Sequence, residues 1–169
     1  MYDVIIAGAG PAGLSAALYA SRGKLSVLLL EQNYMNGGKL LNAKLVYNYP
    51  GIPGVSGVDL MIRMQNQAED YGVTFATETI TKLQLDGPVK RVITDRNTYE
   101  AGTVILAMGS DHKQMDIHGV PAVAGCGVSY NAMADGPFFR GSDVAIVGGG
   151  DVAAQYALFL TKIARKMYL

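Results

Sequence analysis

The sequence contains a single cysteine, Cys126, so it cannot form a disulfide bond within the chain, and such a low content is typical of a reducing compartment. It has no cluster of basic residues, and its 14 Lys and Arg residues are balanced by 14 Asp and Glu residues, which argues against nucleic acid as a partner. No apolar run approaches the roughly 20 residues that span a bilayer, so no membrane association is expected. The two histidines, His112 and His118, lack the spacing of metal ligands and are expected to be surface residues.

The apolar N-terminus does not have the form of a secretory signal, because it lacks a basic leader and contains Asp3 and Pro11. We interpret it as part of the fold and expect a cytoplasmic protein. The chain has 169 residues, 50% of them hydrophobic and 17% charged, which is sufficient for an ordinary globular domain.

The strongest functional pattern lies in the first 31 residues. An apolar run over residues 2–7 leads directly into Gly8-Ala9-Gly10-Pro11-Ala12-Gly13, and Ala and Leu then recur at helical spacing. This order of strand, tight turn and helix is the setting of the dinucleotide-binding fingerprint GxGxxG. In that fingerprint Gly8 permits the turn, Gly10 lets the backbone approach a pyrophosphate, and Gly13 allows the helix to pack closely on the strand.

A second predicted strand, over residues 25–30, ends in Glu31. A carboxylate at that place can accept hydrogen bonds from ribose hydroxyls, while the pyrophosphate lies at the helix N-terminus, where unpaired amides favour negative charge. The alternative is a glycine-rich turn that binds nothing. It would have to explain by chance the preceding strand, the following helix and the position of Glu31. The sequence therefore predicts a dinucleotide site.

The next part of the chain contains two turn-rich loops, over residues 32–40 and 48–54, which are long enough to carry binding function. Ser56 and Asp59 have the spacing of a capping box, and a helix is predicted over residues 57–71. Its buried stripe is predicted to contain Leu60, Met61, Met64 and Ala68.

From residue 73 the pattern changes to short alternating strands, and we expect a small antiparallel β-meander inserted into the α/β plan. Its predicted strands cover residues 73–75, 79–85, 89–94 and 98–100. An all-apolar strand over residues 103–107 then suits a parallel sheet that is buried on both faces. It ends at Met108-Gly109-Ser110, where Gly109 would let a cofactor approach the backbone.

The end of the chain repeats the first pattern. After an irregular linker over residues 109–127, a strand over residues 143–147 leads into Gly148-Gly149-Gly150-Asp151-Val152-Ala153, a GxGxxA variant of the fingerprint, and then into a helix extending to Ile163. Two such units imply two bound nucleotides. The simplest interpretation is a flavin in the first unit and a nicotinamide cofactor in the second, because hydride passes between these two cofactors.

We therefore predict an α/β protein with two domains. Residues 1–112 would form a Rossmann-like FAD-binding domain with the inserted antiparallel β-meander. Residues 113–169 would form the start of a second Rossmann-like NAD(P)-binding domain, which is incomplete because it has only one strand and helix and the beginning of a further strand.

With both units placed, the sequence resembles the low-molecular-weight thioredoxin reductase family of flavoproteins, the class II pyridine nucleotide-disulfide oxidoreductases, nearly from end to end. The motifs that carry the resemblance are at residues 8–13, 37–38, 48–51, 107–109, 127–130, 135–141 and 148–151. Membership implies FAD in the first unit, NADPH or NADH in the second, and a homodimer whose domains swing to bring each partner to the flavin. It also implies an electron acceptor, such as a thioredoxin-like or ferredoxin-like protein.

The resemblance also implies which residues bind the cofactors. The matching FAD positions are Gly8, Gly10, Pro11, Ala12, Gly13, Glu31, Gly38, Lys39, Asn48 and Gly109. The matching positions for the nicotinamide cofactor are Gly148, Gly150, Asp151 and Ala153.

The largest departure from the family is at its redox CxxC motif. Asn131 and Ala134 occupy the positions of the two cysteines. Thiol–disulfide exchange requires one thiolate to attack and a second thiol to resolve the mixed disulfide, so this chain cannot carry the internal relay. Asp135 stands where the family has a proton donor, and it is our one catalytic candidate. Cys126 has no partner thiol, and we expect it to be structural or incidental.

Two smaller departures lie in the first unit, where Lys39 replaces the family's usual glutamine and Met108 its usual threonine. Lys39 near a flavin would favour the anionic reduced form, although a solvated surface lysine is the simpler interpretation. The segment that completes the FAD domain in the family is also missing, so we expect these residues to be part of a protein nearly twice as long.

Three functions are compatible with this sequence. The first is a flavin-dependent NAD(P)H oxidoreductase of the thioredoxin reductase type that lacks the internal dithiol in this chain, and we favour it. The second is a true thioredoxin-disulfide reductase whose cysteines were altered or misread. The third is a non-catalytic FAD-binding regulatory protein.

Overall fold

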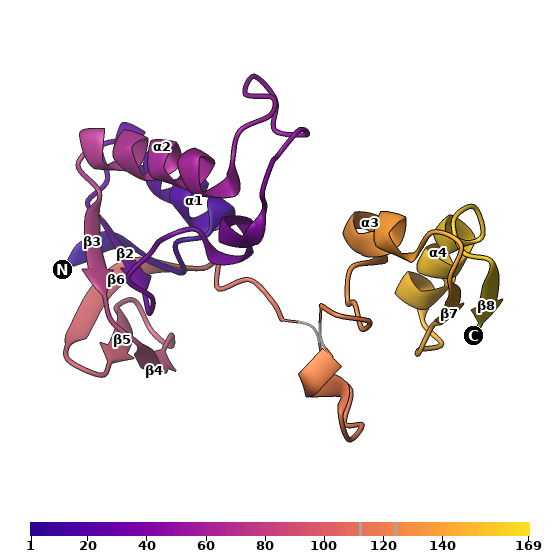
Figure 1. Cartoon of the computed structure of the whole chain (residues 1–169). Coiled ribbons are helices and arrows are strands. Elements are labelled where there is room, and N and C mark those ends of the chain that lie inside the picture. The colour runs from indigo at the N-terminus through magenta and orange to yellow at the C-terminus, as the bar shows by residue number, and fades with distance from the viewer. Residues whose placement is uncertain (112, 124) are drawn as a thin grey trace. The chain divides into compact units, whose positions relative to one another are not determined.

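The computed structural model in Figure 1 describes residues 1–111, 113–123 and 125–169. The chain divides into two compact units, Met1–Ser110 and Asp111–Leu169. His118 is exposed, as predicted, whereas the prediction for His112 falls outside the described residues. Among the helices of the described ranges, none has the length and apolar character needed to cross a membrane.

Unit 1, residues 1–110, contains a six-stranded sheet in the order β3-β2-β1-β6-β5-β4. Its strands are β1 (Tyr2–Ala7), β2 (Val27–Glu31), β3 (Thr74–Thr77), β4 (Ile80–Gln84), β5 (Lys90–Thr94) and β6 (Thr98–Leu106). β1, β2, β3 and β6 run parallel, whereas β5 and β4 continue from β6 as an antiparallel meander. The predicted α/β class with an inserted antiparallel element is confirmed.

The central strands β1 and β2 are buried on both faces of the sheet, which explains their nearly continuous apolar sequences. On one face Ile6 and Leu29 belong to a core cluster with residues of the two long helices of unit 1. On the other face Ile5 and Leu28 pack with Val92 of the meander. Burying each of these large side chains stabilises the unit by about 1.5–3 kcal/mol before the loss of chain entropy is counted.

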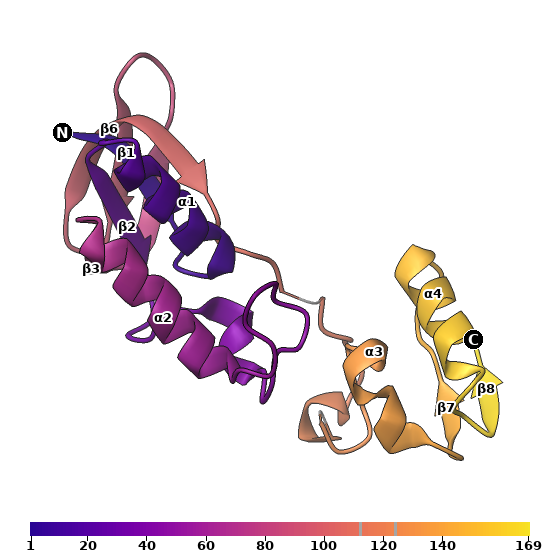
Figure 2. The ribbon, with the colours of Figure 1, turned by 90° about the horizontal axis from the view of Figure 1, so that it is seen from above.

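Helices α1 (Pro11–Arg22) and α2 (Gly57–Asp70) lie side by side on the same face of the sheet (Figure 2). Half of the predicted capping box is present: Ser56 Oγ caps α2 by accepting a hydrogen bond from Asp59 N at 3.0 Å, and it also donates one to Asp59 Oδ2 at 2.7 Å. The predicted buried stripe of α2 is also present: Leu60, Met61 and Ala68 are buried and Met64 is half-buried. Between β2 and α2 the chain forms a short 3₁₀ helix, η1 (Gly38–Asn42), and a loop closed by a bridge between Val46 and Val55.

Two predictions about the strands were wrong. Residues 73–75 were expected to begin the meander, but β3 pairs in parallel with β2 and forms the edge of the main sheet. Residues 98–100 and 103–107 were expected to be separate strands, but β6 is continuous from Thr98 to Leu106. Alternation of apolar and polar residues indicates which face is buried and carries no information on the direction of the neighbouring strand.

Unit 2, residues 111–169, has the predicted order of strand, glycine turn, helix and strand. Its elements are η2 (Val120–Val123), α3 (Ala132–Asp135), η3 (Gly136–Phe139), β7 (Asp143–Ala145), α4 (Asp151–Leu160) and β8 (Lys166–Tyr168). β7 and β8 are parallel, and Arg165 donates two hydrogen bonds to the Asp143 carboxylate, at 2.8 and 3.0 Å. α4 ends three residues before the predicted Ile163, because residues 161–163 form a turn.

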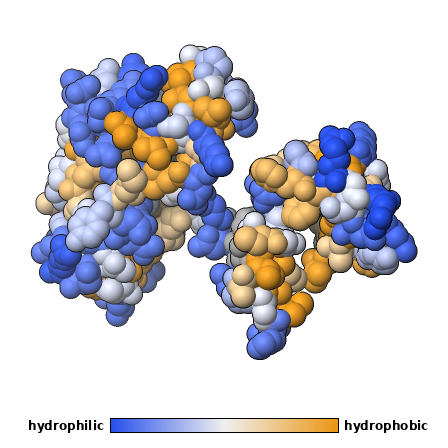
Figure 3. Space-filling model, viewed as in Figure 1, coloured by the Kyte–Doolittle hydropathy of each residue, from blue (hydrophilic) through white to orange (hydrophobic). Residues whose placement is uncertain are grey.

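The surface of unit 2 carries large apolar side chains (Figure 3). Val147, Val152 and Leu158 are each at least 60% exposed, and Leu160 is the only buried residue of α4 in the described ranges. A helix and a two-stranded sheet have too little apolar surface between them to bury both faces of either element.

Within α1, the hydroxyl of Ser21 is buried, with no hydrogen-bond partner among the described residues. We predict that Ser21→Ala raises the free energy of unfolding of unit 1 by about 1 kcal/mol, because an unsatisfied buried polar group is removed and alanine favours the helix. Urea denaturation followed by far-UV circular dichroism measures this change. Ser15→Ala is the matched control, since Ser15 Oγ donates to Pro11 O at 2.7 Å and the lost bond offsets the gain in helix propensity. A Ser21→Ala variant less stable than wild type would contradict the prediction.

Candidate nucleotide-binding site

The turn between β1 and α1 depends on two glycines that leave no room for a side chain. Gly8 has φ +100°, and a Cβ there would lie 2.5 Å from Ala107 O of the neighbouring chain segment. A Cβ on Gly13 would lie 1.8 Å from Gly8 O. The turn also hydrogen-bonds to the end of β2, since Gly8 N donates to Leu30 O at 2.8 Å. These contacts hold the first turn of α1 directly against the carboxyl ends of β1, β2 and β6.

Unlike Gly8 and Gly13, Gly10 has open space around it. A Cβ on Gly10 would meet no atom within 4 Å, so its side of the turn is open. Gly38, at the start of η1, lies next to it, because a Cβ on Gly38 would be 3.7 Å from Gly10 Cα. The structure therefore brings together two glycines that lie 28 residues apart in the sequence. A pyrophosphate fits such a place because it can approach amide groups closely.

The N-terminus of α1 has no side-chain cap. Gly10 is its N-cap, and Pro11 and Ala12 begin the first turn. Within the described part of the chain, no side chain accepts a hydrogen bond from the first amides. By contrast, α2 is capped by Ser56 and α3 by Asn131. Uncapped first-turn amides are the donors that bind anions at helix N-termini.

Glu31 is fixed beside this turn at the end of β2. Its Oε2 accepts a hydrogen bond from Ala9 N at 2.9 Å, and its Oε1 accepts from Asn33 N at 3.1 Å and Asn33 Nδ2 at 3.0 Å. The carboxylate is half-buried and retains acceptor capacity, because two carboxylate oxygens offer about four acceptor positions. Glu31 thus lies at the end of β2 beside the glycine turn, which is where the sequence analysis expected it.

A pocket of about 150 Å³ extends from this turn along the carboxyl ends of the parallel strands. It is lined by Gly8, Leu30, Glu31, Gln32, Glu78, Ile80 and Met108. Ligands of open α/β sheets bind at this edge, where the chain connections diverge on either side of the central strand.

Most of the lining residues were missed by the sequence analysis. Glu78 and Ile80 follow β3, and assigning residues 73–75 to the meander removed them from the carboxyl edge of the parallel sheet. Met108 was noted as the end of a predicted strand and as a departure from the family pattern. The signal for Glu78 and Met108 is their position within two residues of the end of a parallel strand, β3 or β6, whereas Ile80 begins β4.

The remaining predicted FAD residues lie in exposed segments of unit 1. Lys39 is exposed in η1, one residue after Gly38, and Asn48 is exposed in the loop that Val46 and Val55 close. Gly109 follows Met108 after β6 and has φ +73°, a conformation that L-residues rarely adopt.

Glu78 is the centre of a hydrogen-bond network on the meander. Its Oε2 accepts from Thr94 Oγ1 at 2.6 Å, and its Oε1 accepts from Asn97 Nδ2 at 2.8 Å and from Tyr99 OH at 2.9 Å. The hydrogen bond from Thr94, followed by those from Asn97 and Tyr99, lowers the pKa of Glu78 below its ordinary value, against the opposing effect of burial. Burial, followed by the hydrogen bond to Glu78, raises the pKa of Tyr99.

The second glycine turn lies in unit 2, between β7 and α4. Gly148 has φ +142°, and a Cβ on it would lie 3.4 Å from the Ala153 Cβ, so the turn packs closely on α4. Gly150 is the N-cap of α4 without a side-chain cap, and a Cβ on Gly150 would meet no atom within 4 Å. Asp151 occupies the first helical position. This arrangement repeats that of α1 and has the form expected for a second pyrophosphate site.

The positions that correspond to the family's redox motif lie around α3. Asn131 Oδ1 accepts from Ala134 N at 3.3 Å and caps the helix, and Asn131 N donates to Ser129 Oγ at 3.0 Å. Ser129 Oγ donates to Asp135 Oδ2 at 2.6 Å. Asn131 and Ala134 are both exposed, so this segment is stabilised by caps and leaves the two cysteine positions at the surface.

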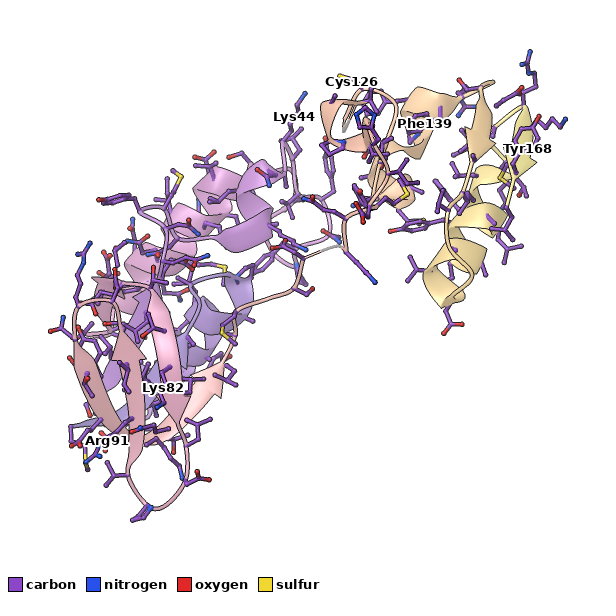
Figure 4. The ribbon with its side chains drawn as sticks, turned by 90° about the horizontal axis from the view of Figure 1, so that it is seen from below. Lys44, Lys82, Arg91, Cys126, Phe139 and Tyr168 are labelled. Atoms are coloured by element: carbon purple, nitrogen blue, oxygen red, sulfur yellow. The ribbon has the colours of Figure 1, made fainter. Side chains whose placement is uncertain are left out.

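Cys126 is exposed and lines a pocket in unit 2. Phe139, labelled with it in Figure 4, lines the same pocket. The other residues of this pocket include Ser129, Asp135 and Phe138. Among the described residues, no group of three or more His, Cys, Asp or Glu side chains could hold a metal ion.

The contrast between the two glycines predicts different effects of the same substitution. We expect Gly13→Ala to lower the free energy of unfolding of unit 1 by at least about 2 kcal/mol, because its methyl group would overlap Gly8 O. Gly10→Ala should change it by less than about 1 kcal/mol, because Gly10 has φ −74° and open space around it. Urea denaturation of both variants measures the difference, and equal destabilisation would contradict the structure.

The network around Glu78 predicts a defined dependence of stability on pH. Because the pKa of Glu78 is lower in the folded state, its ionised form stabilises unit 1 above the unfolded pKa of about 4.3, and this contribution is lost as pH falls through the folded pKa. We therefore expect the difference in unfolding free energy between wild type and Glu78→Gln to be constant near neutral pH and to shrink below pH 4. Urea titrations at several pH values measure it, and a difference that stays constant down to pH 2 would contradict the prediction.

Comparison with known proteins gives a consistent family. Residues 2–169 match the family described as pyridine nucleotide-disulphide oxidoreductase. The chain is 45% identical over 171 residues to a bifunctional thioredoxin reductase/thioredoxin of Mycobacterium leprae, in an alignment covering 100% of the chain and 37% of that protein. It is 44% identical over 170 residues to a thioredoxin reductase of Mycolicibacterium smegmatis, covering 100% of the chain and 54% of that protein.

A solved structure shows the same likeness. The crystal structure of thioredoxin reductase from Streptococcus pyogenes superposes with a TM-score of 0.81 and 41% sequence identity, over 99% of this chain and 54% of that one. The chain thus spans about half the length, or less, of the relatives it matches. The matching family comprises domains that bind FAD and NAD(P), which agrees with the two uncapped glycine turns. The chain belongs to the pyridine nucleotide-disulphide oxidoreductase family.

Proposed function

We propose that this chain is part of a flavin-dependent NAD(P)H oxidoreductase of the thioredoxin reductase type, in which the chain itself provides no internal dithiol. FAD would bind to residues 1–112 and the nicotinamide cofactor to residues 113–169. The observation that carries the proposal is the open Gly10 at the uncapped N-terminus of α1, beside a fixed Glu31 carboxylate.

The residues of unit 1 would hold FAD in three ways. The first amides of α1, with Gly8, Gly10 and Gly13 giving backbone access, would bind the pyrophosphate. Glu31 would accept hydrogen bonds from the ribose hydroxyls, and its bond from Ala9 N keeps the carboxylate turned toward the glycine turn. The pocket between β2, β4 and Met108 would take the adenosine end of the cofactor.

The other FAD positions implied by the family are part of the same proposal. Gly38, Lys39, Asn48 and Gly109 would lie near the remainder of the flavin, and Gly38 is already next to Gly10. Bound FAD supplies the redox chemistry, because it accepts a hydride from a reduced nicotinamide nucleotide and passes electrons onward.

Unit 2 would bind the nicotinamide cofactor through the turn between β7 and α4. Gly148 and Gly150 would give the pyrophosphate access to the first amides of α4, and Ala153 would keep the helix close to the turn. Asp151 follows this N-cap in the first turn. The proposal requires a compartment that supplies reduced nicotinamide nucleotides, as the cytoplasm does.

The electron acceptor is proposed to lie outside this chain. Asn131 and Ala134 have no sulfur, so a thioredoxin-like or ferredoxin-like protein, a small molecule or oxygen would receive electrons from the flavin without an internal disulfide relay. Asp135 remains the catalytic candidate, with its carboxylate held by Ser129. A homodimer is part of the proposal, as in the family that the sequence resembles.

We predict that the full-length protein is yellow, that NADPH or NADH bleaches its flavin absorbance, and that no dithiol can be titrated at its flavin. Absorbance spectroscopy under anaerobic conditions and a thiol titration of the reduced protein measure these properties. Because Gly10 is open, Gly10→Val should reduce FAD uptake while the fold is retained. A colourless protein that takes up no FAD would overturn the proposal, and flavin reducible only by dithionite would favour a non-catalytic role.

A double substitution tests the role of the missing thiols. Asn131→Cys with Ala134→Cys restores the CxxC spacing at the start of α3, where the helix N-terminus lowers thiol pKa. If the chain otherwise retains the family's machinery, this variant should gain a disulfide that NADPH reduces to a dithiol, together with measurable thioredoxin turnover. Each single substitution is the matched control, because one thiol cannot resolve a mixed disulfide. A dithiol titratable in the unsubstituted protein would instead favour altered or misread cysteines, and resequencing the codons of residues 131 and 134 checks this.

A further inference from the structure

Among the described residues that line the pocket of unit 1, Met108 alone carries sulfur. It follows the end of β6 by two residues and is 62% exposed. Its backbone lies directly beside the glycine turn, because a Cβ on Gly8 would be 2.9 Å from Met108 Cα. One residue earlier, Ala107 N donates to Ala7 O at 2.8 Å, which fixes this part of the chain at the end of β1. Met108 is therefore both held at the pocket and open to small solutes.

Exposure distinguishes Met108 from the methionines of the core. Met61 of α2 is only 1% exposed, and Met64 is half-buried. Met133 is 58% exposed, but it belongs to α3 of unit 2. The thioether of methionine is oxidised by small oxidants to a sulfoxide, and this reaction requires access to the sulfur. Met108 and Met133 are thus similarly accessible, and of these two only Met108 lines the pocket of unit 1.

The other side chains of the pocket give a sulfoxide oxygen little to bond with. They are apolar, acidic or amide side chains: Leu30, Ile80, Glu31, Glu78 and Gln32. A sulfoxide oxygen and an ionised carboxylate are both acceptors, and Gln32, which is exposed, has the one side-chain donor in this set. In the open pocket water can pair with the new oxygen. A ligand that covers Met108 displaces this water, and leaving a polar group unpaired costs its desolvation free energy.

We propose that Met108 is an oxidation site through which peroxide controls the uptake of cofactor by unit 1. The thioether sulfur attacks one oxygen of hydrogen peroxide, the O–O bond breaks, and the sulfur keeps that oxygen as a sulfoxide. The other oxygen leaves as water with both hydrogens. The sulfur loses two electrons, which the peroxide gains. The inference rests on the proposed function, because FAD is the cofactor whose uptake would be controlled.

The proposed function also supplies a source of the oxidant. A reduced flavin that passes two electrons and two protons to oxygen, one of the acceptors named above, yields hydrogen peroxide. Oxidation of Met108 would lower flavin occupancy where this product accumulates, and methionine sulfoxide reductases can reverse the change. Threonine, the family's usual residue at this position, has no sulfur, so the family pattern does not provide this site.

The experiment treats the full-length protein with dilute hydrogen peroxide, and catalase ends the reaction. Peptide mass spectrometry measures the fraction of each methionine that has gained an oxygen atom, and quenching of flavin fluorescence measures the dissociation constant for FAD. We expect Met108 to be oxidised well before Met61, and bound FAD to slow the oxidation of Met108 by covering it. Peroxide should raise the dissociation constant for FAD by at least about fivefold, because the sulfoxide is left unpaired when FAD binds.

Three variants make the result specific, each compared with itself before and after peroxide. Met108→Leu keeps an apolar side chain of similar size without sulfur, and its dissociation constant should rise by less than about twofold. Met133→Leu is the matched control at similar exposure, and Cys126→Ser removes the one thiol of the chain. Both controls should keep the full peroxide effect of wild type.

A fourth variant tests the inference without peroxide. Met108→Gln places a polar side chain of similar length where the sulfoxide would be. It should bind FAD at least about fivefold more weakly than Met108→Leu, because both change the same residue and only glutamine adds polar atoms. Equal affinity of these two variants would contradict the effect assigned to the sulfoxide.

The outcomes separate this inference from the proposed function. Untreated wild type that binds no FAD would refute FAD binding itself, while mass spectrometry would still report whether Met108 is the reactive methionine. If wild type binds FAD and Met108 is oxidised with no change in affinity, the control by peroxide is wrong. The same holds if Met108→Leu loses affinity as wild type does. If Met108 reacts no faster than Met61, it is not an oxidation site.

Discussion

The contact between Gly13 and the carbonyl of Gly8 is the constraint on which the rest of unit 1 depends. A Cβ at Gly13 would be 1.8 Å from that oxygen, and a Cβ at Gly8 would be 2.5 Å from Ala107 O. These two close approaches place the first turn of α1 against β1 and β6 at once. As a consequence, the uncapped amides of α1, the Glu31 carboxylate and the pocket that ends at Met108 share one edge of the sheet.

The two glycine turns leave backbone amides without side-chain caps at the starts of α1 and α4. α2 and α3 begin with side-chain caps from Ser56 and Asn131, which satisfy amides that would otherwise need a ligand or water. α1 and α4 begin with Gly10 and Gly150, which have no side chain to offer. Whether the first amides of a helix are capped therefore depends on the single residue at its N-cap.

The sequence predicted the parts of the fold and site that depend on local pattern, and it missed those that depend on strand direction. Gly8, Gly10, Gly13 and Glu31 could be placed because their spacing is set by one strand, one turn and one helix. Glu78 could not, because a short alternating strand pairs equally well in parallel or antiparallel sheets. Only the pairing of β3 with β2 puts that residue at the carboxyl edge.

The segment over residues 129–135 is stabilised by hydrogen bonds between polar side chains and the backbone. Asn131 caps α3 through Ala134 N, and Ser129 links Asn131 N to the Asp135 carboxylate. A cysteine at position 131 would lose this amide cap, since a thiol is a weaker hydrogen-bond acceptor than an amide oxygen. Asparagine therefore suits the local backbone at the start of α3, because its side-chain oxygen caps the helix.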